Sequence, residues 1–134
     1  MTMKIIRIIL KHYPKTQAVY LFGSYETDFE RSDSDIDLAL LLPHGSREGN
    51  LQLAGSDCRF ELEEMLGKEV DLLNLRMLST VFQKEVIMTG KLIHCAERYA
   101  VDEFEMLTMS SYQKLNEERA EILALIGKTG RILT

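Results

Sequence analysis

The sequence has few of the features that mark specialised classes of protein. Its only two cysteines, Cys58 and Cys95, stand far apart and form no CxxC pair, so they suggest neither a disulfide framework nor a zinc site. No apolar run approaches the roughly 20 residues that a membrane-spanning helix needs. The first residues are amphipathic and lack a signal-peptide cleavage pattern. We therefore expect a cytoplasmic protein that makes no membrane contact.

The sequence also lacks an excess of positive charge. Its formal net charge is −5, and no basic stripe is present to follow a phosphate backbone, so direct binding of a long nucleic acid is not expected. A mononucleotide neutralised by a metal ion stays open as a ligand. Hydrophobic residues make up 46% of the chain and charged residues 28%, which is typical of a folded globular protein. A length of 134 residues, without repeats or linkers, fits one domain, residues 1–134.

Hydrophobic periodicity predicts alternating helices and strands. Period-3.6 patterns indicate helices, and short apolar runs that end at glycine or proline indicate strands. The expected helices are 3–12, 51–66 and 78–88, the expected strands are 18–22, 36–42, 70–75 and a short edge strand 92–95, and the remainder is helical. This pattern predicts an α/β (α+β) fold, a small mixed sheet flanked by helices. It divides into a core, residues 1–95, and a helical tail, residues 96–134.

The candidate chemistry lies where the first two strands meet. Gly23-Ser24 ends the first strand, and after ten residues Asp35-Ile36-Asp37 opens the second. Residues i and i+2 of a strand share a face, so Asp35 and Asp37 present two carboxylates side by side. Such a pair suits magnesium, which completes its shell with water and substrate phosphates. The alternative is an ordinary solvated turn that enters a strand.

Two further features fit a phosphate ligand. Gly23 leaves room for close backbone approach, and Ser24 offers a hydroxyl and an N–H where a helix would begin, although a plain turn has the same composition. Asp71 lies in an apolar strand. If that strand neighbours the Asp35–Asp37 strand, Asp71 supplies a further metal ligand or a base for an attacking hydroxyl. Otherwise it is a surface carboxylate.

The block FGS, ten residues and DID resembles the signature of the DNA polymerase beta-like nucleotidyltransferase superfamily. Length, the later VDLL strand and the helical tail resemble its minimal nucleotidyltransferase (MNT) domain proteins. The resemblance implies a polymerase beta-like fold in which Gly23 and Ser24 bind the triphosphate of ATP. It also implies that Asp35, Asp37 and Asp71 are catalytic and hold two Mg²⁺ ions. Many relatives carry Arg directly after FGS where this chain has Tyr25, and Arg31 is a candidate to replace it.

MNT proteins of this size resemble the antitoxins of HEPN/MNT toxin–antitoxin modules. The resemblance implies a protein adenylyltransferase that transfers AMP from ATP to a tyrosine hydroxyl of a HEPN ribonuclease toxin and so neutralises it. The apolar-rich tail is then a candidate surface for docking that partner. Two alternatives remain open: a small-molecule nucleotidyltransferase of the aminoglycoside-modifying kind, and an antitoxin that neutralises its partner by binding alone.

Overall fold

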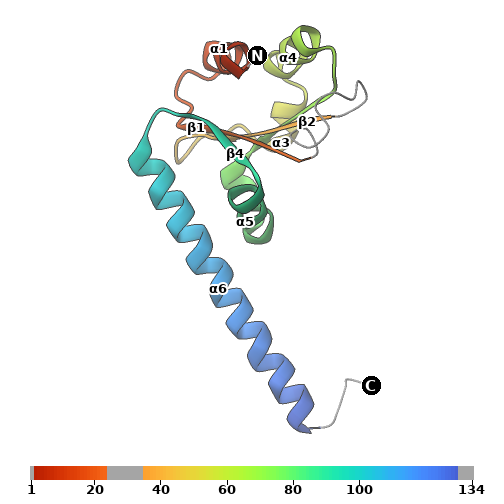
Figure 1. Cartoon of the computed structure of the whole chain (residues 1–134), viewed down its shortest axis with the longest axis vertical. Helices are drawn as coiled ribbons and strands as arrows, with labels where there is room; N and C mark the ends of the chain where they lie inside the picture. The colour runs from red at the N-terminus through yellow and green to blue at the C-terminus, as the bar shows by residue number, and fades with distance from the viewer. Residues whose placement is uncertain (1, 24–34, 130–134) are drawn as a thin grey trace.

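A four-stranded mixed sheet forms the centre of the computed structural model, which describes residues 2–23 and 35–129 (Figure 1). The strands are β1 (Ala18–Phe22), β2 (Ile36–Leu41), β3 (Val70–Asn74) and β4 (Lys91–Cys95). Their order is β3-β2-β1-β4, in which β1 runs antiparallel to β2 and β4 while β2 and β3 run parallel. The α+β fold with a mixed sheet, expected from the sequence, is confirmed.

Helices cover both faces of this sheet. They are α1 (Thr2–His12), α3 (Asn50–Ala54), α4 (Asp57–Leu66), α5 (Thr80–Thr89) and α6 (Arg98–Thr129), with a short 3₁₀ turn, η1 (Leu75–Met77), between β3 and α5. Helices α1, α3 and α4 share one core cluster with alternate strand residues that include Ile36, Leu38 and Leu72. Helices α5 and α6 share a second cluster that includes Tyr20 and Ala39. Alternation along each strand thus gives the sheet two buried faces.

Local capping changes the helix expected at residues 51–66. The structure divides it into α3 and α4, because Gly55 ends the first helix and Ser56 caps the second. The Ser56 hydroxyl accepts a hydrogen bond from the Arg59 N–H at 3.2 Å, which satisfies one of the donors left unpaired at a helix start. Gly67 ends α4 in the left-handed conformation, which glycine adopts without strain. The break lies away from the candidate site.

The helical tail is one long helix. Figure 1 shows α6 leaving the end of β4, passing α5 and continuing well beyond the rest of the molecule. Its first turns are anchored: Val101 and Phe104 are buried in the second core cluster, and the Tyr20 hydroxyl donates to Glu105 Oε2 at 2.6 Å. None of the described helices combines the length and apolarity that a membrane span requires.

Candidate active site

The carboxylates predicted from the sequence meet at one end of the sheet. Asp37 is the second residue of β2 and Asp71 the second of β3, and the parallel register pairs them directly. Their carboxyl groups share a hydrogen bond. The sequence left open whether the Asp71 strand neighbours the Asp37 strand, and the structure shows that it does. Asp35 lies just before β2 and is exposed to solvent.

Both carboxylates of the pair lie on the sheet face that α5 and α6 cover. Ile36 and Leu38 point into the cluster on the α1 and α4 side, so Asp37, between them, points to the opposite face with Ala39. Asp71 alternates in the same way with Val70 and Leu72. The site therefore opens toward α5.

Crowding of negative charge alters the acidity of this site. Burial is the largest cause that raises the pKa of Asp37, to about 6, and the hydrogen bond to Asp71 and the charges of Asp71 and Asp35 add to it. A bound cation would relieve this repulsion. Within residues 2–23 and 35–129, no three acidic, histidine or cysteine side chains lie close enough together to hold a metal ion by themselves. Two paired carboxylates are nevertheless enough to bind Mg²⁺, because this ion takes water and substrate phosphates as the rest of its coordination shell.

Gly23 supports the Asp37 carboxylate from the end of β1. Its φ of 82° is in the left-handed region, and a Cβ at this position would collide with the Asp37 side chain. Phe22, just before it, is the cross-strand partner of Asp37. Only glycine therefore lets the chain turn this close to the carboxylate. The other expected phosphate ligand, Ser24, lies outside the described residues, as do Tyr25 and Arg31.

A cavity of about 350 Å³ adjoins Gly23 between the end of β1 and α5. Sequence patterns gave no sign of it, because its walls come from two segments far apart in the chain. Its lining residues are Phe22, Gly23, Ser79, Val81, Phe82, Glu85, Val86 and Thr89. Because Gly23 lines this cavity and also lies against the Asp37 side chain, the cavity is next to the carboxylate pair.

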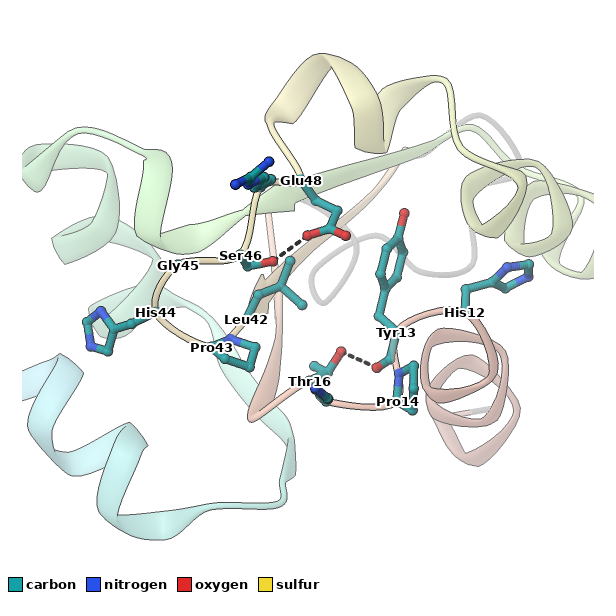
Figure 2. A pocket seen from close by; sticks show the side chains of 12 residues that line it. His12, Tyr13, Pro14, Thr16, Leu42, Pro43, His44, Gly45, Ser46 and Glu48 are labelled. Atoms are coloured by element: carbon teal, nitrogen blue, oxygen red, sulfur yellow. Dashed lines mark hydrogen bonds between the residues drawn. The ribbon is translucent and has the colours of Figure 1, made fainter.

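A larger cavity, of about 630 Å³, lies at the opposite end of the sheet (Figure 2). It is formed by the segment between α1 and β1 and the segment after β2. Tyr13 from the first segment and Glu48 from the second both line it. Glu48 accepts a hydrogen bond from the Ser46 hydroxyl, and the Thr16 hydroxyl donates to the Tyr13 carbonyl at 2.7 Å. Because β1 runs away from this end toward Gly23, the length of the strand separates this cavity from the carboxylates.

Comparison with known proteins agrees with this arrangement. The family model described as "Polymerase beta, Nucleotidyltransferase" matches residues 4–99. The protein adenylyltransferase MntA of Shewanella oneidensis is 36% identical over 121 residues, which cover 90% of this chain and 83% of that protein.

Two solved structures cover nearly the whole chain. A toxin–antitoxin structure with AMP-PNP aligns with a TM-score of 0.76 at 33% identity, over 93% of this chain and 97% of that one. A complex of tri-AMPylated Shewanella oneidensis HEPN toxin with MNT antitoxin aligns with a TM-score of 0.72 at 33% identity, over 93% and 94% of the two chains. Family model, identity and fold agree, and the chain belongs to the polymerase beta nucleotidyltransferase family.

Proposed function

We propose that this chain is a protein adenylyltransferase that transfers AMP from ATP to a tyrosine hydroxyl of a HEPN toxin and thereby neutralises it. The observation that carries the proposal is the in-register pair of Asp37 and Asp71 beside Gly23, at the end of the sheet where the Asp71 side chain is exposed. The similarity to MntA and to a complex that contains an AMPylated HEPN toxin supports a HEPN toxin as the acceptor of AMP. We expect the reaction to take place in the cytoplasm, where ATP is available.

The acidic residues of this site would hold Mg²⁺. We assign Asp35, Asp37 and Asp71 as its ligands, with two ions expected when ATP is bound. Bound there, the metal supplies positive charge that neutralises the triphosphate and stabilises the attacking and leaving oxygens. The exposed positions of Asp35 and Asp71 leave these carboxylates accessible to a substrate that arrives with its own phosphate ligands.

The protein's own groups position the reactants and move the proton. Gly23 and Ser24 bind the triphosphate, because the missing side chain at Gly23 lets phosphate approach the backbone. The tyrosine oxygen of the toxin attacks the α-phosphorus, the bond to the bridging oxygen of the β-phosphate breaks, and pyrophosphate leaves. Asp71 accepts the proton of the tyrosine hydroxyl. AMP then remains on the toxin as a tyrosine phosphodiester.

We further propose that residues 1–95 form the catalytic core and that the tail, residues 96–134, docks the toxin. Beyond the turns that pack on the body, α6 carries exposed apolar side chains, including Leu115 and Ile122. At 100° per residue, both fall within about 20° of the buried Phe104 around the helix. The apolar stripe that packs against the body therefore continues past it and offers a surface on which the toxin can pack.

Charge placed on this stripe tests the docking role. We expect Leu115→Asp and Ile122→Asp to weaken the complex with the toxin, measured by co-purification and by calorimetric titration. The matched control is Ala120→Asp, which adds the same charge to the opposite side of α6 and should bind normally. Equal binding by all three variants would move docking to another surface.

AMP transfer is tested by intact-mass spectrometry. The protein, Mg²⁺ and ATP are incubated with the purified HEPN partner, beside an Asp35→Asn/Asp37→Asn control. The proposal predicts AMP additions on the toxin with the unaltered protein alone, and their loss when the acceptor tyrosine is replaced by Phe. Protection without added mass would instead identify an antitoxin that acts by binding.

A further inference from the structure

We propose that α6 binds the toxin through one amphipathic helix, which inserts a large apolar side chain beside Leu107 and places a basic residue opposite Glu118. The inference rests on the proposed function and deepens it, because it names the kind of partner element that the tail docks. Its basis is a seam on α6, defined as Leu107, Ser111, Leu115, Glu118, Ile122 and Leu125. The seam begins at a cavity on the body and follows the part of α6 that projects beyond the body (Figure 1).

The spacing of the seam is that of a helix that packs against another helix. From Ser111 onward its members follow at steps of four, three, four and three residues, the alternation found in coiled coils. At about 100° per residue, all six positions lie within an arc of about 80° around α6. The four apolar side chains of the seam are between 42% and 62% exposed. A narrow seam of this kind is buried most completely by a second helix laid along it.

A cavity of about 250 Å³ lies between α6 and the body, where the seam begins. Its lining residues are His44, Arg76, Gln83, Phe104, Leu107, Thr108 and Ser111. The Arg76 guanidinium is already engaged, because it donates to the Leu42 carbonyl and the Gln17 side chain, both at 2.6 Å. The volume is below the roughly 300 Å³ at which small-molecule sites begin. With Phe104 and Leu107 in its walls, the cavity therefore suits one apolar side chain of a partner.

A carboxylate interrupts the apolar seam. Glu118 lies between Leu115 and Ile122 and is exposed in the free protein. A helix that covers the seam takes this charge out of water, which is costly unless an opposite charge meets it. The partner helix therefore carries lysine or arginine at that point. A second copy of this chain fits the seam less well, because two α6 helices in parallel register would bring two Glu118 carboxylates together.

Calorimetric titration with the purified toxin, without ATP or Mg²⁺, tests the charge. Glu118→Lys should weaken binding at least about 10-fold, because like charges would then meet in the interface. The matched control is Glu117→Lys, which makes the same change about 100° away, outside the seam, and should bind normally. The basic residues of the toxin are then replaced by Glu one at a time. One of these changes should restore the affinity of the Glu118→Lys variant.

Ser111→Phe tests the cavity. The new ring adds apolar surface to the seam but fills the cavity, so we expect the affinity for the toxin to fall about 10-fold, as for loss of a buried anchor. The matched control is Ser110→Phe, which makes the same change at a neighbouring position outside the seam. Both serines are exposed, so neither change enters the core. Tighter binding by Ser111→Phe would overturn the anchor, because it would show that the partner leaves the cavity empty.

The outcomes separate this proposal from the proposed function. Titration without ATP needs no AMP transfer, so a toxin that shows the expected pattern of variants but gains no AMP would refute the proposed function alone. Normal binding by both Glu118→Lys and Ser111→Phe, in a protein that transfers AMP, would overturn the partner helix alone. If the unaltered protein bound no toxin, both would fail.

Two controls complete the test. Circular dichroism identifies a variant that fails to fold, and the remaining variant then decides the question. Sedimentation of the protein without the toxin tests the second occupant. A dimer that Leu115→Asp dissociates would overturn the proposal, because the seam would then hold a second α6.

Discussion

Replacement of Asp37 by Asn should stabilise the metal-free protein at pH 8. The pKa of Asp37 is raised from 3.8 to about 6, so the folded state holds this proton more tightly than the unfolded chain does. The favourable contribution of protonated Asp37 is therefore complete below about pH 4 and is lost as the pH rises through about 6. Asparagine carries no charge at any of these pH values, so the variant avoids the cost of a half-buried negative charge beside Asp71.

The size of the effect follows from the pKa. A change from 3.8 to about 6 corresponds to about 3 kcal/mol if fully expressed. Asp37 is only half-buried, and solvent screens its charge, so we expect on the order of 1–2 kcal/mol at pH 8. For a chain of this length, that corresponds to a rise in Tm of about 4–8 °C.

Thermal and urea denaturation in the presence of EDTA measure the difference. Wild type and Asp37→Asn should converge toward pH 4, where folded Asp37 is protonated, and diverge by pH 8, where it is ionised. Asp35→Asn is the matched control: Asp35 is exposed, so its removal should give a smaller gain. Magnesium should stabilise the wild type at pH 8 more than Asp37→Asn. If Asp37→Asn were no more stable than wild type at pH 8, the assignment of a crowded carboxylate pair would be refuted.

Three further substitutions test the supports of the site and of α6. Gly23→Ala should abolish AMP transfer and cost about 1–2 kcal/mol in urea unfolding, since it combines a positive φ with a collision against the Asp37 carboxylate; full activity would disprove the close approach. Tyr20→Phe removes a hydrogen bond to a carboxylate and should cost about 1.5–3 kcal/mol, with faster amide exchange in the first half of α6; unchanged exchange would show that apolar packing alone anchors the helix. Arg76→Lys should lower Tm, because the guanidinium donates to the Leu42 carbonyl and the Gln17 side chain, both at 2.6 Å, and an ammonium group cannot span both; an unaltered Tm would contradict this clamp.

Sequence reasoning located the strands and the carboxylates because their signals are local. The apolar run from Ile36 ends at Pro43, and β2 follows it closely. Alternation alone placed Asp35 and Asp37 on a common face. The comparisons confirm the resemblance to MNT proteins, whereas the assigned roles of Gly23, Ser24 and the three aspartates remain predictions for the experiments above.

Features that depend on packing between distant segments could not be read from the sequence. The register that joins Asp37 to Asp71 exists because β3 lies beside β2 in parallel, and the composition of neither strand specifies that neighbour. The 3₁₀ turn after Asn74 interrupts a run that was predicted to stay extended through Leu75, because the Asn74 side chain accepts from the Arg76 N–H. The cavity lined by Phe82 arises only when α5 packs against the end of β1.

Helix α5 connects the two activities that we assign to this chain. One side of it lines the cavity through Phe82 and Glu85, and the other packs against α6, where Lys84 contacts the Tyr112 ring. Lys84 and Glu85 are adjacent and ion-paired, so a toxin that repositions Tyr112 would act on the pair that borders the cavity. Coupling between sites requires a physical element that contacts both. Helix α5 is such an element, because it lines the cavity beside Gly23 and packs against α6.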